Sequence, residues 1–213
     1  PSIFDLNIKI HDKQGNLLLD LPNYMKITSP DSKLVKINFN ELITKNNIDT
    51  KNSLTAQIIT NFQDKKIPTR IKFGLNVGKK RNESKLPCNI CFNSHLGNPP
   101  IDNKPNSFHW CPMFSTGNTV ISFENSSPVK NYLKNATLLL TFYREKDTTS
   151  IEKQITIPAH GEFRFNLIKE HDDVLKFLDG DTGWITARAD NPYIVGYYFN
   201  IHSSGAVAGD HVF

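Results

Sequence analysis

The 213-residue chain is long enough for two domains of about 100 residues each. Its 38% hydrophobic and 22% charged residues are typical of a soluble globular protein and exclude a disordered one. No apolar run approaches the roughly 20 residues of a membrane-spanning helix. The net charge of +4 is mild and the longest basic cluster is Lys79–Arg81, so nucleic-acid binding is not expected.

The first residues, Pro1–Asp5, lack the charged lead and apolar core of a signal peptide, which favours a cytoplasmic location. Three cysteines cannot pair completely, and this argues against a secreted domain held together by disulfides. The frequent use of Lys and Asn indicates a bacterial source with an AT-rich genome.

The first half of the chain reads as a series of short strands. Leu6–Ile10 is followed by turn residues at Asp12–Asn16, and the alternation of Val35, Ile37 and Phe39 predicts another strand. Strands are also expected at Leu54–Ile59 and Pro68–Asn76.

Residues 77–125 form a central segment that is rich in Asn, Pro and Gly and holds all three cysteines. Thr119–Phe123 alternates well enough to predict a strand, and the rest reads as long loops. Long ordered loops often carry function, so candidate ligand contacts are sought here first.

The second half shows a clearer β pattern, with turn signals about every 8 to 15 residues. A turn is predicted at Pro158–Gly161 and a short helix at Asp172–Leu178, which Gly180 ends. A hairpin turn at Ser203–Gly205 leads into a closing strand that ties the tail into the sheet. The expected strands are 136–143, 151–157, 163–167, 184–188 and 193–201.

The two halves repeat each other in order. Leu54–Ile59 matches the strand that begins at Trp184, and Pro68–Asn76 matches Pro192–Asn200 with Pro and Asn at equal separations. The sequence therefore predicts an all-β protein of two tandem, related β-sandwich halves, immunoglobulin-like or jelly-roll-like, joined by a loop-rich central insert. The predicted boundaries are 1–76, 77–125 and 126–213.

The second half resembles immunoglobulin-like β-sandwich domains of uncharacterised bacterial proteins. The residues that carry the resemblance are Leu138–Tyr143, Ile155–Gly161 with Phe163 and Phe165, and Asp190–Pro192 with Gly196–Phe199. It implies a fold and no function, because it includes no chemical motif.

Cysteines and histidines gather around the central segment. Thiolates and imidazoles are ligands of zinc, and iron is the other metal considered. The competing interpretation is that the cysteines are buried apolar groups, because Cys88 and Cys91 would point to opposite faces of a strand. The candidate metal ligands are Cys88, Cys91, His95, His109 and His211.

Two further features suggest ligand contacts. Asp210 beside His211 is able to orient an imidazole, although neighbours in a strand are expected to face apart. The aromatic run Tyr193–Phe199 is either a stacking platform or core, and alternation favours core. The candidate ligand-binding residues are His95, His109, Trp110, His202, Asp210 and His211.

No nucleophile elbow, zinc-protease motif, phosphate loop or dinucleotide fingerprint is present, which argues against an enzyme. The leading hypothesis is a non-enzymatic binding or interaction module that uses the central loops and the C-terminal strand. Its ligand is a protein, a carbohydrate or a small molecule. The alternatives are a metal-binding protein or metal-dependent enzyme, and a structural subunit of a larger assembly that forms homo-oligomers.

Overall fold

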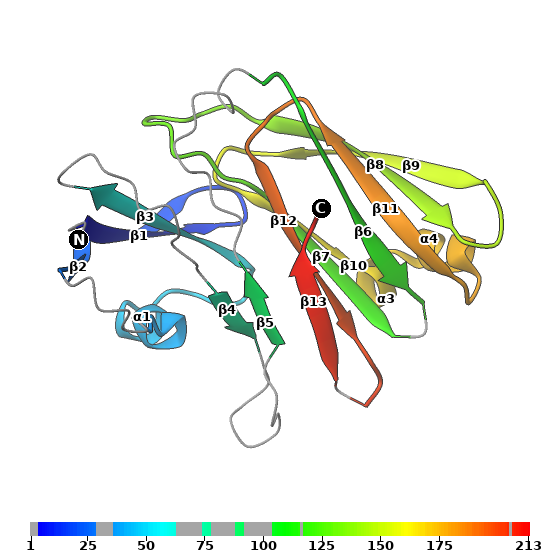
Figure 1. The fold of residues 1–213 in the computed structure, drawn as a ribbon, viewed down its shortest axis with the longest axis horizontal. Helices are drawn as coiled ribbons and strands as arrows, with labels where there is room; N and C mark the ends of the chain where they lie inside the picture. Colours follow the sequence, from blue (N-terminus) through cyan, green and yellow to red (C-terminus); the bar gives the residue numbers. More distant parts are fainter. Residues whose placement is uncertain are drawn as a thin grey trace.

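The computed structural model describes residues 4–28, 36–62, 74–77, 88–91, 104–115, 117–204 and 206–213. Most of them lie in antiparallel strands, so the prediction of an all-β protein is confirmed (Figure 1). The strands are β1 (Phe4–Asp12), β2 (Leu17–Ile27), β3 (Leu54–Phe62), β4 (Gly74–Val77), β5 (Cys88–Cys91), β6 (Ser107–Phe114), β7 (Asn118–Asn125), β8 (Ala136–Arg144), β9 (Ser150–Ile157), β10 (Glu162–Asn166), β11 (Thr182–Ala189), β12 (Ile194–Ile201) and β13 (Val207–His211). The helices are α1 (Phe39–Lys45), α3 (Leu167–Glu170) and α4 (Asp172–Leu178).

Two four-stranded sheets form a sandwich from residues 107–213. The front sheet has the order β6-β11-β8-β9, and the back sheet has the order β10-β7-β12-β13. The sandwich therefore takes in β6 and β7, which belong to the central segment of the sequence. The strand expected at Thr119–Phe123 is β7, and it lies between β10 and β12.

The sandwich core follows from period-2 alternation on the facing strands. Leu138, Leu140 and Phe142 of β8 are fully buried, and the Phe142 ring lies 5.3 Å from that of Phe165 on β10. The closing strand predicted at the C-terminus is β13, which pairs with β12.

The predicted helix is also present as α4. It ends at Asp179, which adopts a left-handed conformation, and Gly180 follows with φ +80°. A residue with a side chain adopts such a φ at a cost, so glycine suits this position.

The first half of the chain folds around the sheet β2-β1-β3 (Figure 1, left), one side of which is covered by α1. Ile8, Ile10 and Leu42 form its buried core. The strand predicted from Val35 to Phe39 is wrong where the structure describes it, because α1 begins at Phe39. Asn38 caps α1: its Oδ1 accepts from the backbone N of Glu41, and its Nδ2 donates to Glu41 Oε1.

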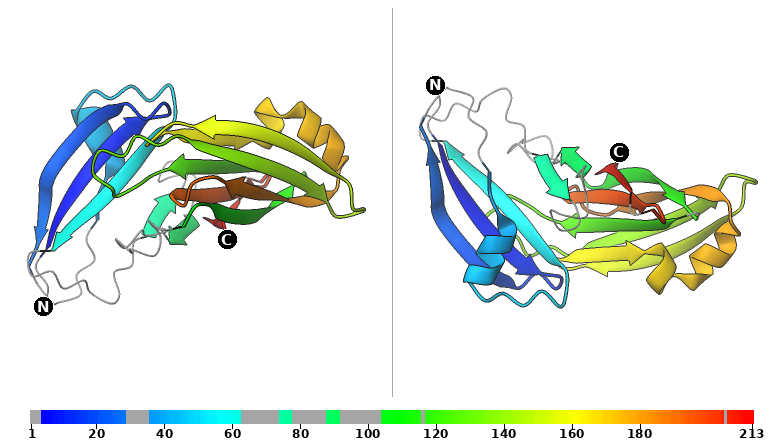
Figure 2. Two further views of the ribbon diagram at one scale, coloured as in Figure 1. Left: turned by 90° about the horizontal axis from the view of Figure 1, so that it is seen from above. Right: turned by 90° about the horizontal axis from the view of Figure 1, so that it is seen from below.

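The first half docks on one end of the sandwich through two turns, at an angle that Figure 2 shows. The backbone N of Glu162 donates to the carbonyl of Lys13 over 3.0 Å. Gly15 has φ +85°, and a Cβ there would lie 1.9 Å from the carbonyl oxygen of Ala159. The β1–β2 turn and the Pro158–Gly161 turn therefore meet backbone to backbone, which only glycine permits at position 15.

Aromatic rings from both halves fill this junction. His11 of β1 stacks on His160 with ring centroids 4.8 Å apart, and Tyr132 meets His160 edge-on at 5.6 Å. The Tyr132 hydroxyl donates to Asn125 Oδ1 over 2.7 Å and also contacts Asn191 Nδ2. We call His11, Tyr132, His160 and Tyr193 the junction cluster.

Candidate functional site

The outward side of the front sheet carries an exposed set of aromatic side chains. On β6, Cys111 and Met113 are fully buried, so the residues that alternate with them point outward. The same alternation on β8 and β11 places a second and a third column beside the first. We call these outward residues the aromatic face: Phe108, Trp110, Pro112, Phe114, Thr137, Leu139, Thr141, Tyr143, Trp184, Thr186 and Arg188.

Strand register arranges the aromatic face in rows that run across the sheet. One row is Pro112–Trp184–Tyr143, the next is Trp110–Thr186–Thr141, and the third is Phe108–Arg188–Leu139. The Trp184 and Tyr143 rings stack at 5.3 Å with 13° between their planes. Cross-strand neighbours thus fix the positions of these rings without any loop.

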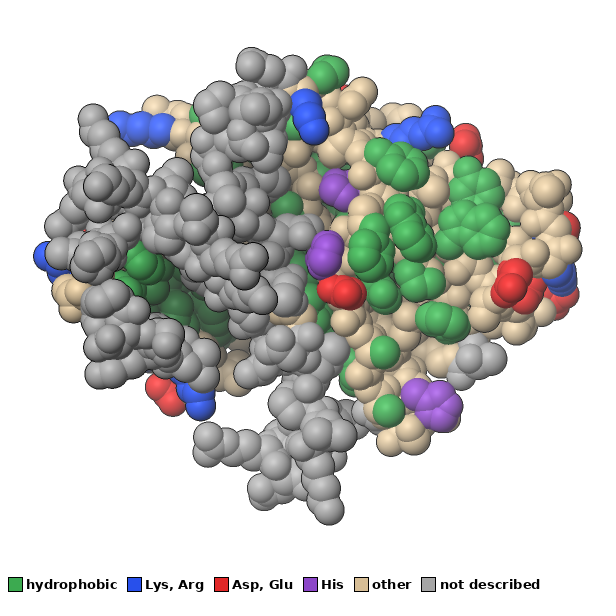
Figure 3. All heavy atoms as spheres, viewed as in Figure 1, with side chains coloured by type: hydrophobic (Ala, Val, Ile, Leu, Met, Phe, Trp, Pro, Cys, Tyr) green, Lys and Arg blue, Asp and Glu red, His purple; other side chains and the backbone are tan. Residues whose placement is uncertain are grey.

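The aromatic face is open to solvent. Trp184 is 38% exposed, Trp110 45% and Phe108 52%. In Figure 3, hydrophobic side chains gather over β6 and β11 on the right of the molecule. Aromatic side chains of 150–250 Å² each, exposed to this degree together with Phe114 and Phe213, present on the order of 400 Å² of apolar surface. A patch of this size in a soluble protein marks an interaction site more often than a single exposed residue does.

Charge is nearly absent from the aromatic face. The chain has 25 lysine and arginine residues, yet Arg188 is the one that stands among the outward residues of β6, β8 and β11. Its guanidinium lies 6.0 Å from the centre of the Phe108 ring, within the range of a cation–π contact. The face therefore combines aromatic rings with a single arginine and no lysine.

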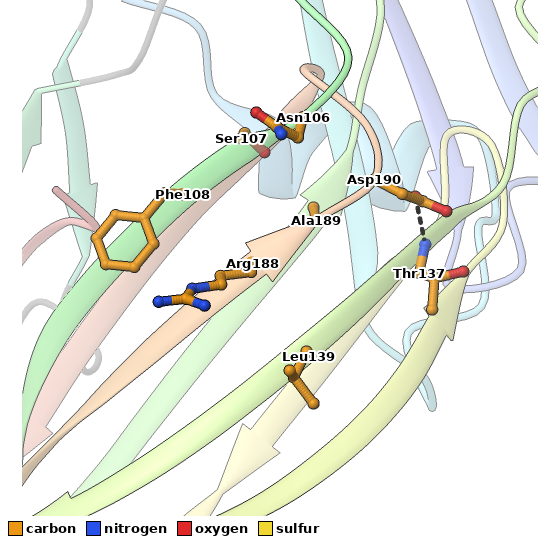
Figure 4. A pocket seen from close by; sticks show the side chains of 8 residues that line it. All are labelled: Asn106, Ser107, Phe108, Thr137, Leu139, Arg188, Ala189 and Asp190. Carbon is orange, nitrogen blue, oxygen red and sulfur yellow. Dashed lines mark hydrogen bonds between the residues drawn. The ribbon is translucent and has the colours of Figure 1, made fainter.

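An open depression of about 590 Å³ lies at one end of the aromatic face. Figure 4 shows Phe108, Arg188 and Leu139 on its floor, from three adjacent strands. The carboxylate of Asp190 accepts from the backbone N of Thr137 over 2.8 Å. That bond fixes the polar end of the depression, while the Arg188 guanidinium lies beside the Phe108 ring.

The C-terminal residues border the face at β6. Trp110 N donates to the carbonyl of Phe213 over 2.8 Å, and Phe213 N donates back to Trp110 O. The Phe213 ring lies 5.2 Å from both the Trp110 ring and the His211 ring. The fold thus joins Trp110 and His211, two of the predicted ligand-binding residues, through Phe213.

The expectation that Asp210 and His211 do not touch is wrong. His211 Nδ1 lies 2.9 Å from Asp210 Oδ1, because the Asp210 carboxylate turns toward the backbone of His211, whose N also donates to Oδ1 over 2.8 Å. His202 lies at the other end of β13, in the turn that leads into it, where its Nδ1 contacts Ser204. His202 therefore does not join Trp110 and His211.

The remaining candidates are only partly described. The side chain of His109 lies on the core side of β6, whereas the side chain of Trp110 points outward from the sheet. Cys88 and Cys91 are the first and last residues of β5, so the interpretation that this segment is a strand is confirmed. The structure does not describe their side chains, and His95 lies outside the described residues. Among the residues that the structure describes, no three His, Cys, Asp or Glu side chains group as metal ligands.

Cys111 fits the interpretation of a buried apolar cysteine. It is fully buried, and burial raises the pKa of its thiol far above the usual range. A buried thiol of this kind behaves as a small apolar side chain. The zinc or iron site stays a prediction that concerns Cys88, Cys91, His95, His109 and His211.

The aromatic run Tyr193–Phe199 is largely covered, and one side of its strand faces the sandwich core, as alternation favoured. Tyr193 and Tyr197 are less than one-tenth exposed, and Tyr198 packs against the sandwich core. The exposed aromatic side chains lie instead on the front sheet. Phe108, Trp110 and Phe114 alternate within Ser107–Phe114, and that period-2 signal was present in a segment interpreted as loop.

An acidic pair lies on the outward side of the back sheet. Glu124 and Glu162 stand directly opposite each other on β7 and β10. Burial and the neighbouring Glu162 raise the pKa of Glu124 to about 8, so near neutral pH this carboxyl is largely protonated. Ser122 Oγ donates to Glu162 Oε1 over 2.7 Å, and among the described residues no third His, Cys, Asp or Glu joins the pair as a metal ligand.

Comparisons with known proteins add no function. No protein-family model and no curated protein matches the chain. One solved structure, described as the crystal structure of Thermotoga maritima 1070, has a TM-score of 0.39 and 11% identity over 50% of this chain and 91% of its own. Within the described ranges, none of the helices has the length and apolar character that spanning a membrane requires.

Proposed function

We propose that this chain is a non-enzymatic interaction module that binds a protein partner through the aromatic face. The observation that carries the proposal is the segregation of side chains. Exposed Trp and Phe residues share the outward side of three strands with one arginine and no lysine, although lysine is common elsewhere in the chain. Cores of protein interfaces are enriched in aromatic residues and arginine and depleted of lysine.

The detail of the face also favours a protein. Trp110, Trp184 and Arg188 belong to the residue types that dominate binding energy at interfaces. At the β9 edge of the face stand Glu152 and Gln154, which are polar and exposed, as residues at the rim of an interface often are.

A carbohydrate is the less favoured ligand. Sugar rings are expected to stack on aromatic faces that are open to solvent, whereas the Trp184 and Tyr143 rings stack on each other. The mutual stack leaves less ring surface for a flat sugar. A protein side chain is able to pack against ring edges as well as faces.

The proposal is tested with immobilised chain and an extract of the organism that encodes it. The wild type is compared with the double variant Trp110→Ala and Trp184→Ala. We expect at least one protein to be retained by the wild type, to be lost with the double variant, and to bind the wild type directly once purified.

Leu133→Ala serves as the matched control, because Leu133 is a large apolar residue that is 85% exposed and is not part of the aromatic face. It should retain the same protein as the wild type. Identical retention by all three chains would refute the proposal, as would Trp-dependent retention of the purified chain on an insoluble polysaccharide and on no protein.

A further inference from the structure

The contact between the first half and the sandwich is built around two stacked imidazoles. His11 belongs to β1 and His160 to the Pro158–Gly161 turn, and their ring centroids lie 4.8 Å apart with 10° between the ring planes. Because one ring comes from each side of the junction, like charge on the two rings would push the first half away from the sandwich.

The surroundings of both rings suit the neutral form. His11 is 4% exposed, and its buried Nδ1 has no hydrogen-bond partner in the described part of the chain. His160 Nδ1 lies 3.3 Å from Gln57 Nε2, and because an amide nitrogen only donates, the ring nitrogen accepts this bond. A proton added at His11 Nδ1 would be buried without an acceptor, and one at His160 Nδ1 would remove the acceptor of the Gln57 amide.

The charged groups around the stack act in both directions. Burial, His160 and Lys9 lower the pKa of His11, whereas Asp12 and Asp20 raise it, and the result is a pKa of about 4. Asp20 is paired with Lys9, whose Nζ lies 3.3 Å from Asp20 Oδ2. Burial and Lys9 also lower the pKa of His160. Each ring therefore binds a proton more weakly in the closed junction than in water.

We propose that protonation of His11 and His160 separates the first half of the chain from the sandwich, while the sandwich stays folded. In the separated form both rings are in water, where an imidazole binds its proton at about pH 6.5. The closed junction is therefore favoured above this pH and is weakened as the pH falls toward 4. Between pH 7 and pH 5, His11 alone shifts the equilibrium toward the separated form roughly 20-fold, and His160 adds to this shift.

The junction is able to open without disrupting the core of the sandwich. Two of its polar contacts are Glu162 N, which donates to Lys13 O over 3.0 Å, and Thr55 Oγ1, which donates to His160 O over 3.1 Å. The sandwich core lies elsewhere and includes Leu140 on β8, an inner strand of the front sheet. Separation thus exchanges the junction contacts for contacts with water and leaves the core packed.

The interval from pH 7 to pH 5 distinguishes the imidazoles from other titratable groups near the junction. Burial raises the pKa of Asp12, but hydrogen bonds, first that of Asn16, outweigh burial and hold the pKa below the ordinary 3.8. Burial and Glu162 raise the pKa of Glu124 to about 8, and burial raises the pKa of Tyr132. Asp12 thus stays charged in this interval, while Glu124 and Tyr132 stay largely neutral.

Hydrogen exchange of the Glu162 amide tests the inference on the intact chain, because this amide donates to Lys13 across the junction. NMR gives its protection factor, which corrects for the intrinsic pH dependence of exchange and reports the population of open junction. We expect the factor to fall at least about 20-fold from pH 7 to pH 5. At both pH values Glu162 should be less protected than Leu140, whose amide exchanges when the sandwich unfolds.

Three variants assign the response. His11→Phe keeps a ring in the stack without a charge, so the fall should be smaller by roughly the 20-fold that His11 contributes. His160→Asn should also reduce the fall, and asparagine tolerates the φ of +60° at this position. His171→Phe is the matched control, because this imidazole stacks on Phe165 at 4.2 Å and burial lowers its pKa, but it lies within the sandwich. It should leave the fall at Glu162 unchanged.

If the Glu162 amide is equally protected at pH 7 and pH 5, the inference is overturned. It is also overturned if Glu162 and Leu140 have equal protection factors at both pH values, because the first half then leaves the sandwich only when the whole chain unfolds. A fall that is as large in His11→Phe as in the wild type assigns the acid response to a different group and excludes the imidazole stack.

Discussion

Two aromatic clusters of this protein have opposite surroundings. In the junction cluster, His11, Tyr132 and Tyr193 are all less than one-tenth exposed, and the Tyr132 hydroxyl is bonded to the side chains of two asparagines. On the aromatic face, Trp110 and Trp184 are about two-fifths exposed. Aromatic rings thus hold the two halves of the chain together in the junction cluster, whereas those of the aromatic face are open to solvent.

Burial and polar partners distinguish the two clusters. Aromatic rings that come with satisfied hydroxyls and well-packed backbone serve folding, since an unmet polar group inside the junction would cost free energy. Rings that stand on a regular strand with open surroundings add little to folding and much to binding. Breaking each cluster in turn separates these contributions.

The largest effect is expected from Gly15→Ala in the junction. The new Cβ would lie 1.9 Å from the Ala159 carbonyl oxygen, so the two docked turns must separate. Left-handed backbone alone costs a residue with a side chain about 1–2 kcal/mol, and overpacking adds roughly 1–3 kcal/mol. Urea unfolding should show a loss of about 2–5 kcal/mol.

Gly180→Ala is the matched control for that substitution. Gly180 has a similar φ of +80°, but no described atom lies within 4 Å of its would-be Cβ. The free energy of unfolding of this variant should fall only by the backbone cost of about 1–2 kcal/mol. Equal losses in the two variants would show that the contact between the turns contributes nothing.

The second-largest effect that we expect is a loss of stability at acidic pH, caused by His11 in the junction. Burial, the adjacent His160 and Lys9 lower the pKa of His11 from its ordinary 6.5 to about 4. The folded state thus favours neutral His11. The contribution of neutral His11 to the free energy of unfolding is complete above pH 6.5 and is lost as the pH falls toward 4. For a pKa shift of this size the loss is up to about 3 kcal/mol.

Urea unfolding of the wild type and of His11→Gln between pH 7 and pH 4 measures this contribution. The variant should lose less stability over that interval than the wild type, because glutamine does not titrate. Asp12 and Asp20 act on His11 in the opposite direction and are unchanged in the variant. The control His202→Gln, in an exposed turn, should lose as much stability between pH 7 and pH 4 as the wild type. If His11→Gln also loses as much as the wild type, His11 is not the source of the acid sensitivity.

The smallest effect compares one hydroxyl in each cluster. Tyr132→Phe removes the donor to Asn125 Oδ1 inside the junction and should cost about 1–2 kcal/mol in thermal or urea unfolding. Tyr143→Phe alters a partly exposed hydroxyl of the aromatic face and should stay within about 0.5 kcal/mol of the wild type. Equal costs would contradict the distinction between a structural and an interacting cluster.

Local sequence patterns determined much of the secondary structure. Alternation in β8, β11 and β12 identified which side chains share a face, because successive residues of a strand point to opposite sides. The helix at Asp172–Leu178 followed from its spacing and from Gly180. Alternation misled at Val35–Phe39, where Asn38 and Glu41 carry the spacing of a helix cap and start α1 instead.

Only the tertiary structure decided which faces are covered. Tyr197 on β12 and Trp110 on β6 both lie on the outward side of a regular strand, yet Tyr197 is 8% exposed and Trp110 is 45% exposed. The back sheet has β5 packed beside β13, whereas the aromatic face is open to solvent. Alternation along one strand determines the side on which a residue lies. Whether that side is buried depends on chain segments far away in the sequence.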